Sequence, residues 1–218
     1  MNLGMDPQRW PRLTILGTED TFLPRRVWCV GRNYAAHARE MGEDGRKPPL
    51  IFSKNPICLT PVAAEVSGRV NYPPDTEALH HEVEMVLALG EGGKVLGAAV
   101  GLDMTRRDLQ TRMKERRGPW SLAKDFDGAA PIGPIRLGPV PENGEIGLWV
   151  DGERRQVANL NEMIWNAEAL CKRLSETVQL AAGDLIFTGT PAGVGPVVRG
   201  QTLRAEIEGL PTLQVVVD

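Results

Sequence analysis

The chain of 218 residues is 42% hydrophobic and 24% charged, with a net charge of −3 at pH 7, a composition that predicts one globular domain with a substantial core. The slightly acidic balance gives no electrostatic reason for binding nucleic acid or an acidic membrane, and we expect neither as a partner. Three widely separated cysteines argue against a disulfide framework, and the chain has neither a signal-like N-terminus nor about 18 consecutive apolar residues, so we expect a cytoplasmic protein.

Short apolar runs between turns rich in glycine and proline predict strands at 25–31, 50–54, 80–90, 96–105, 147–153, 183–189 and 212–218. The segment 143–157 predicts a hairpin that turns at Asp151-Gly152, because this pair suits the positive φ angles of a tight turn. Helical periodicity occurs at 33–41, 105–117 and 161–180, and in the last segment an apolar stripe runs from Met163 to Leu174. These elements predict an α+β fold dominated by strands.

The stretch EALHHEVEMVLALG (77–90) places two carboxylates in a predicted strand. Residues two apart share a face of a strand, so Glu82 and Glu84 point the same way. Both faces become apolar after Glu84, which indicates a covered sheet, and the next strand ends in another acid, Asp103. Three carboxylates brought together would repel one another unless a cation lay between them, and Mg²⁺ or Mn²⁺ prefers such oxygen ligands. Acids that face solvent fit the same spacing, so the pattern alone leaves both interpretations open.

Two further patterns suggest chemistry. His37 and Glu40 are neighbours on one face of a predicted helix, and a carboxylate beside an imidazole raises its basicity, as a water-activating base requires. Lys124 follows the apolar approach PWSLA, where an ammonium could stabilise developing negative charge. A surface pair and a solvated lysine explain these residues equally well when each is taken alone.

Six motifs occur in an order that resembles the fumarylacetoacetate hydrolase family, in particular its small, single-domain acylpyruvate hydrolase-like branch. They are GRNYAAHAREM, FSK, LHHEVEMVLALG, GLDMTRRDLQ, GPWSLAKDFDGAAPIGP and GDLIFTGTPAGVGP. The resemblance implies the mixed β-sandwich or roll of that family's C-terminal domain, with a few short helices. It also implies a catalytic domain at 26–218, an N-terminal extension at 1–25 packed on it, and a homodimer.

The resemblance also implies roles for individual residues. Glu82, Glu84 and Asp103 match the ligands of one Mg²⁺ or Mn²⁺ ion. His37 and Glu40 match a water-activating pair on a mobile lid at about 33–47, and Lys124 matches the active-site lysine. Residues that match the substrate-binding positions are Arg107, Gln110, Gly189 and Thr190. The sequence departs from the family pattern at two positions. Asp125 follows Lys124, and Asn55 separates Lys54, which matches a lysine of the family, from Pro56.

The implied activity is hydrolysis of a carbon–carbon bond in an acylpyruvate such as fumarylpyruvate or acetylpyruvate, as in aromatic catabolism, with a small keto acid as the partner. An oxaloacetate-type decarboxylase, or a dienedioate decarboxylase or isomerase, would use the same site without an attacking water. A noncatalytic metabolite-binding protein and a sheet protein with solvent-facing acids are the remaining alternatives, because fold alone does not determine function.

Overall fold

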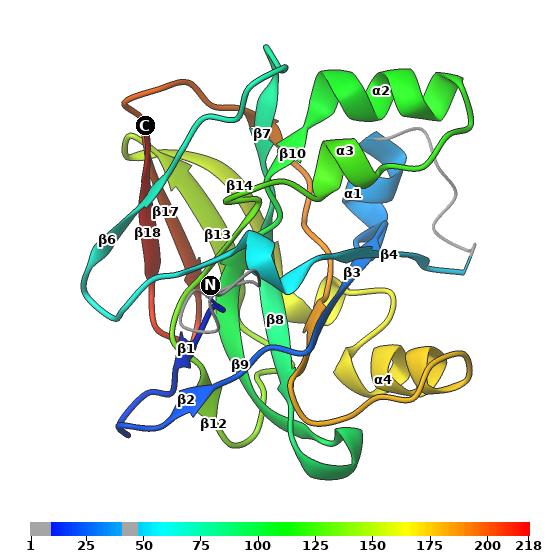
Figure 1. Ribbon diagram of the computed structural model, residues 1–218, viewed down its shortest axis with the longest axis vertical. Coiled ribbons are helices and arrows are strands. Elements are labelled where there is room, and N and C mark those ends of the chain that lie inside the picture. Colours follow the sequence, from blue (N-terminus) through cyan, green and yellow to red (C-terminus); the bar gives the residue numbers. More distant parts are fainter. Residues whose placement is uncertain (1–9, 41–47) are drawn as a thin grey trace, which may run out of the picture.

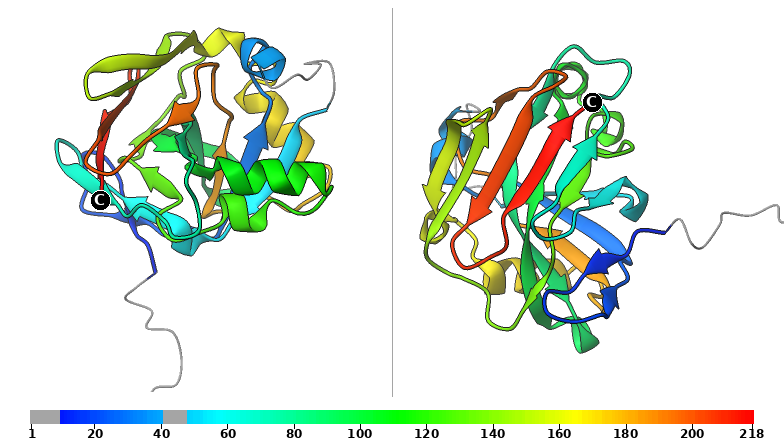
Figure 2. Two further views of the ribbon diagram at one scale, coloured as in Figure 1. Left: turned by 90° about the horizontal axis from the view of Figure 1, so that it is seen from above. Right: turned by 90° about the vertical axis from the view of Figure 1, so that its left-hand side faces the viewer.

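Two curled β-sheets lie face to face and form the frame of the molecule, and α1, α2 and α3 gather at one end of it (Figures 1 and 2). The computed structural model describes residues 10–40 and 48–218, with the backbone alone described at 38–40. Within these residues, no helix is long and apolar enough to span a membrane. The architecture confirms the predicted α+β fold dominated by strands.

The larger sheet has eight strands and carries the acidic residues at one end. Its order is β4 (Leu50–Lys54), β3 (Arg26–Gly31), β15 (Asp184–Phe187), β8 (Val83–Leu89), β9 (Val95–Leu102), β11 (Ala130–Ile132) and β5 (Leu59–Pro61), with β12 (Arg136–Leu137) also paired to β9. The central β8 is buried along its whole length, as the apolar character of both its faces predicts.

The second sheet has five strands and covers one face of the first (Figure 2). Its order is β14 (Glu153–Asn159), β13 (Glu145–Val150), β17 (Thr202–Ile207), β18 (Leu213–Val217) and β6 (Ser67–Val70). Asp151 and Gly152 turn the β13–β14 hairpin with φ angles of 51° and 84°, which confirms that prediction. The strand β17 was not predicted; its buried side alternates with Arg204 and Glu206, so its apolar signal is weak.

Smaller elements connect the two sheets. A three-stranded sheet joins β10 (Thr105–Arg106), β7 (Leu79–His81) and β16 (Gly195–Pro196). The predicted strand at 80–90 is therefore wrong as a single element, because Glu82 interrupts it and the two parts pair in different sheets. The 3₁₀ turns are η2 (Pro56–Cys58), η3 (Glu91–Gly93) and η4 (Leu160–Glu162).

The helices are short. They are α1 (Ala35–Glu40), α2 (Arg107–Glu115), α3 (Ser121–Lys124) and α4 (Ala167–Ser175). The helix expected at 161–180 is shorter in the structure, because the Asn166 side chain accepts a hydrogen bond from Ala169 N–H (3.0 Å) and caps the helix there. Met163 instead belongs to the segment before this cap, in a bridge with Tyr34.

The core forms two clusters, one on each face of the large sheet. Val83, Met85 and Leu87 point toward the five-stranded sheet, whereas Val86 and Ala88 point to the opposite side. The alternation of a strand places Glu84 on the same side as Val86. The pair β1 (Leu13–Thr14) and β2 (Thr21–Phe22) covers this second cluster with two buried side chains, Leu13 and Phe22.

Gly101 in β9 lies opposite Glu84 and leaves room for the second cluster. A Cβ at this position would lie 2.6 Å from Val86 Cγ2 and 2.8 Å from Phe187 Cε1. We predict that Gly101→Ala lowers the free energy of unfolding by about 1–3 kcal/mol, the usual cost of overpacking a core. Denaturant unfolding measures this, with Gly133→Ala as the control because its nearest contact would be an ordinary 3.6 Å. Equal stability of the two variants would contradict the prediction.

Candidate active site

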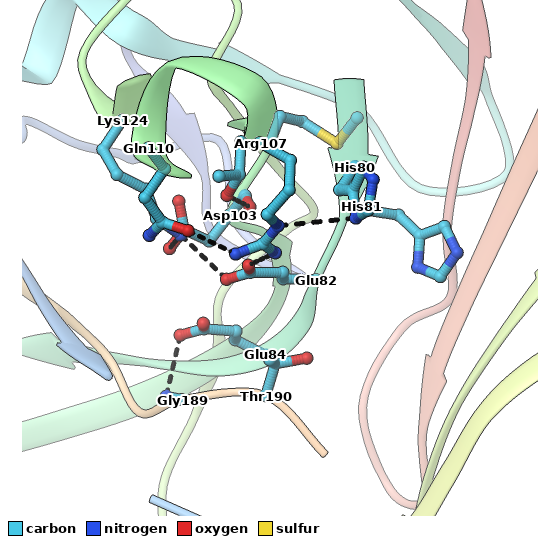
Figure 3. Close-up of polar contacts among 12 residues, drawn as sticks. His80, His81, Glu82, Glu84, Asp103, Arg107, Gln110, Lys124, Gly189 and Thr190 are labelled. Atoms are coloured by element: carbon cyan, nitrogen blue, oxygen red, sulfur yellow. Dashed lines mark hydrogen bonds and ion pairs between the residues drawn. The ribbon is translucent and has the colours of Figure 1, made fainter. Parts of the chain in front are cut away.

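A pocket of about 40 Å³ lies where β8 begins and β9 ends, and residues of α1, α2 and α3 line it. Figure 3 shows the polar contacts among several of its residues. The pocket brings together most of the residues that the sequence predicts for a site. The predicted residues that line it are His37, Glu82, Glu84, Asp103, Arg107, Gln110, Lys124 and Thr190. Gly189 adjoins it through a hydrogen bond to Glu84, and the side chain of Glu40 lies outside the described residues, as does the part 41–47 of the lid expected at about 33–47.

The three acids form one buried cluster. Glu82, Glu84 and Asp103 each offer a carboxylate oxygen, and these oxygens all lie within 4.8 Å of one another. The backbone positions two of them, because Asp103 N–H donates to Glu82 O (2.9 Å) and extends the pairing of β8 and β9. The exposed fractions of the three residues are at most 5%, so the interpretation as solvent-facing acids is wrong.

Cationic side chains surround two of the acids. Lys124 Nζ at the end of α3 donates to Glu82 Oε2 (2.8 Å) and to Asp103 Oδ2 (2.6 Å), and Arg107 pairs with Glu82 Oε1. Burial raises the pKa of Glu82, but Lys124 and Arg107 outweigh it and the pKa is lowered. Burial likewise works against the Lys124 ammonium, yet Asp103 and Glu82 raise its pKa, so this lysine stays charged.

Of the three acids, Glu84 has the least positive charge nearby to compensate its own negative charge. Its Oε2 accepts a hydrogen bond from Gly189 N–H (2.7 Å), while burial and the neighbouring Asp103 and Glu82 raise its pKa well above the usual range. A further positive charge would relieve this repulsion. A buried set of three carboxylates with one poorly neutralised member fits a hard divalent cation such as Mg²⁺ or Mn²⁺.

Lys54, which the sequence left in doubt, reaches this cluster. Its fully buried ammonium lies 2.8 Å from Asp103 Oδ1 and donates to the backbone carbonyls of Met104 (3.3 Å) and Lys124. The additional Asn55 does not displace it, because Asn55 caps η2 through Ile57 N–H (3.1 Å).

Asp125, the second departure from the family pattern, bonds to the same loop. Its Oδ1 accepts hydrogen bonds from Asn55 N–H (2.9 Å) and from the Cys58 thiol (2.7 Å). Burial and this carboxylate raise the pKa of Cys58 to about 12, so the thiol remains protonated. The two departures thus stabilise one loop, and Asp125 is held by that loop rather than paired with Lys124.

The position of α1 depends on Asn33. This buried side chain donates to the carbonyls of Thr188 (2.7 Å) and Trp165 (2.8 Å) and accepts from Trp165 N–H (2.7 Å). The chain that precedes α1 is thereby fixed to the end of β15. His37, in the middle of α1, is buried with 6% exposure and lines the pocket.

Arg107 and Gln110 lie one turn apart on α2 and act together. Arg107 donates to Gln110 Oε1 and to Glu82, while its Nε lies 3.4 Å from His80 Nδ1 (Figure 3). Burial and Arg107 lower the pKa of His80 to about 4, so this imidazole is neutral at pH 7. The side chains of His80 and Gln110 therefore hold the arginine at the pocket.

The loop after β15 requires glycine at 189. Gly189 has a φ of 97°, and a Cβ there would lie 2.9 Å from Val30 O and 2.8 Å from the side chain of Asn33. Its amide is already bonded to Glu84, so in this structure it holds an acid. Thr190, the next residue, lines the pocket.

Six residues of the pocket wall were not predicted as site residues: Val30, Gly31, Arg32, Phe52, Lys114 and Trp120. Arg32 has a φ of 68°, which is unusual for a side chain other than glycine, and Lys114 lies over the Trp120 ring at 5.3 Å. Arg32 belongs to the quoted GRNY motif, and Lys114 follows Gln110 by one helical turn. The helical spacing could have identified Lys114. Position alone could not show that either side chain faces the pocket.

The sequence profile of the fumarylacetoacetate (FAA) hydrolase C-terminal domain matches residues 26–218. The chain belongs to the fumarylacetoacetate hydrolase family. This confirms the resemblance drawn from the six motifs. Residues 1–25 lie outside the matched range, and their role as an extension stays a prediction.

Relatives within the family carry more than one name. The fumarylpyruvate hydrolase of Pseudomonas aeruginosa, solved in complex with Mn²⁺ and pyruvate, is 47% identical with a TM-score of 0.94, covering 98% of this chain and 97% of that one. A fumarylpyruvate hydrolase from a Ralstonia species is 38% identical over 77% of this chain and 92% of its own length. The mitochondrial oxaloacetate tautomerase of Arabidopsis thaliana is 41% identical over 87% of this chain and 89% of its own length.

If the acid cluster binds a cation, Glu84→Gln should weaken Mn²⁺ binding at least about 10-fold, since even indirect partners of metal ligands matter on this scale. Its raised pKa means that ionising Glu84 costs folding free energy at neutral pH. The metal-free variant should therefore be at least as stable as the wild type. Calorimetric Mn²⁺ titration and thermal unfolding without metal measure the two effects.

Glu91→Gln is the matched control, because Glu91 is an exposed acid just beyond the end of β8. Equal Mn²⁺ affinities of the two variants would show that Glu84 is not a ligand.

Proposed function

We propose that the protein is a divalent-metal-dependent hydrolase that cleaves the carbon–carbon bond of an acylpyruvate. The observation that carries the proposal is the pocket itself, in which three buried acids, Lys124 and His37 face one small space. A metabolite-binding protein has no need for a base beside a poorly neutralised acid cluster. The Pseudomonas aeruginosa relative, whose structure contains Mn²⁺ and pyruvate, supports both the cation and the keto acid.

Glu82, Glu84 and Asp103 are the proposed ligands of Mg²⁺ or Mn²⁺. The bound ion supplies a Lewis acid at the keto-acid oxygens. Lys124 contributes a charged donor beside the same acids, and Arg107 contributes a second one held by Glu82. These fixed charges stabilise negative charge on the substrate oxygens where water is excluded.

His37 is the proposed general base. It removes a proton from a water molecule that attacks the acyl carbonyl, and Glu40, three residues later in the sequence, is the proposed partner of this imidazole. The bond between this carbonyl carbon and the pyruvyl methylene then breaks. The electron pair passes to the pyruvate enolate, which takes up a proton to give pyruvate, and the acyl group leaves as a carboxylate.

The charge of the pocket supports an acylpyruvate with a second carboxylate, such as fumarylpyruvate. The cationic residues of the lining are Arg32, Arg107, Lys114 and Lys124, and the anionic ones are Glu82, Glu84 and Asp103. Lys54, whose ammonium lies 2.8 Å from Asp103 Oδ1, is a fifth cation at the acids, and a divalent ion would add two further positive charges, so the loaded pocket suits a dianion. Arg32 and Lys114 both line this pocket, and we place the distal carboxylate near them.

An oxaloacetate activity is the second candidate, because the Arabidopsis relative is named a tautomerase. Tautomerisation or decarboxylation of oxaloacetate needs the charge of Lys124 beside the keto acid but no attacking water. Homodimer formation and a cytoplasmic location remain predictions.

His37→Ala should reduce fumarylpyruvate hydrolysis by about 100-fold or more, the scale of a lost general base. Oxaloacetate decarboxylation should fall much less, because it uses no attacking water, whereas Lys124→Ala should reduce both. Steady-state assays with fumarylpyruvate, acetylpyruvate and oxaloacetate, in Mn²⁺ and in chelator, measure these rates.

Lys172→Ala, at an exposed lysine of α4, is the control for loss of a lysine. Equal losses of hydrolysis and decarboxylation in His37→Ala, with Mn²⁺ affinity retained, would exclude His37 as the water-activating base. Hydrolysis that persists in chelator would exclude the metal.

Arg32→Gln and Lys114→Gln should each raise the KM for fumarylpyruvate about 10-fold, the value of one charge-assisted hydrogen bond, and leave the KM for acetylpyruvate nearly unchanged. Arg112→Gln is the control, since Arg112 is exposed on the same helix as Lys114. Equal effects on both substrates would show that these cations do not bind the distal carboxylate.

A further inference from the structure

Gln156 is a fully buried amide in β14, a strand whose other residues are exposed or half-buried. It belongs to the five-stranded sheet, which contributes no residue to the pocket wall among the residues described. Burying an amide costs free energy unless its polar atoms are bonded. The contacts of Gln156 therefore indicate why it is there.

Two backbone partners fix the orientation of this amide. Val83 N–H can only donate, and it donates to Gln156 Oε1 (3.1 Å); Pro191 C=O can only accept, and it accepts from Gln156 Nε2 (2.9 Å). An exchange of the amide oxygen and nitrogen would break both bonds, so the assignment is unambiguous.

The remaining partners follow from this orientation. Gln156 Nε2 also donates to Thr190 Oγ1 (2.8 Å), and Oε1 lies 2.9 Å from His81 Nδ1. Because Oε1 can only accept, the hydrogen of this contact must lie on His81 Nδ1. All four hydrogen-bonding positions of the amide are then used.

The same reasoning determines whether the Thr190 hydroxyl donates or accepts in each of its hydrogen bonds. Its oxygen accepts from Gln156, so its single proton is available for a different acceptor. Thr190 is 3% exposed and its side chain lines the pocket beside Glu84 (Figure 3). The hydroxyl proton is therefore available to an acceptor that enters the pocket.

We propose that Gln156 is a positioning residue that orients the Thr190 hydroxyl as a hydrogen-bond donor to an oxygen of the bound oxo acid. The same amide joins the start of β8 to the loop at 188–191, so the donor and the acid-bearing strand keep a fixed relation. The choice of acceptor rests on the proposed function, whereas the orientation of the amide does not.

A double-mutant cycle with oxalate as the probe tests the proposal. In Mn²⁺-loaded protein, Thr190→Val should weaken oxalate binding about 10-fold, as for a lost bond to a charged acceptor. Gln156→Met, which keeps the shape of the side chain, should weaken it about 3- to 10-fold in the wild type and have almost no further effect in Thr190→Val. Thr190→Ser should restore binding, and Gln156→Met should raise the KM for fumarylpyruvate with kcat largely kept.

Gln214→Met, in β18 of the same sheet, is the control for replacing a glutamine. If the losses of oxalate affinity in Gln156→Met and Thr190→Val are independent, or if Gln214→Met loses as much as Gln156→Met, Gln156 only supports the fold and the proposal is overturned.

Imidazole ¹⁵N NMR of the metal-free protein provides a readout that needs no substrate. The wild type should carry the His81 hydrogen on Nδ1, and Gln156→Met should lose this preference.

The His81 spectrum also separates the two proposals. A hydrogen on Nε2 in the wild type would refute the Gln156 network directly. Persistence of the Nδ1 form, with no acylpyruvate hydrolysis by the wild type, would count against the proposed function; failure of oxalate to bind at all would overturn the proposed Thr190 contact.

Discussion

Electrostatic repulsion within the cluster of Glu82, Glu84 and Asp103 is the constraint on which the arrangement of the pocket depends. Carboxylates so close together in a buried site require positive charge nearby, and β4, α2 and α3 each supply a cation that contacts them. Lys54 comes from β4 and Lys124 from α3, and both contact Asp103. The repulsion that these cations do not compensate acts on Glu84, as expected of a site that binds a cation.

This constraint explains features that would otherwise look unrelated. The loop stabilised by Asn55 and Asp125 contributes neither residue to the pocket wall. It directly follows Lys54, however, and so helps to hold that lysine at the acids. The glycine at 189 allows a backbone amide to reach Glu84 where a side chain would collide with β3. Packing details at several places in the large sheet therefore help to stabilise the same cluster of acids.

The parts of the site that sequence reasoning predicts are those that follow from periodicity or from long motifs. Alternation along a strand puts Glu82 and Glu84 on one face, and the family resemblance adds Lys124. Gln156 could not be identified in this way, because alternation shows that a residue points inward but not what it meets there. The start of α4 was missed because the Asn166 cap opposes an apolar stripe that continues before it.

The loop at 188–191 is held from both sheets, by Asn33 and Glu84 on one side and by Gln156 on the other. Several hydrogen bonds therefore hold one wall of the pocket, whereas the opposite wall consists of short helices and their side chains. Changes at Lys114 and at other helix positions away from His37, Arg107 and Lys124 could alter which acyl group fits without disturbing the acids. Such a division would let natural selection diversify substrates while the acid cluster stays constant, and it offers a structural reason for related chains to bear different names.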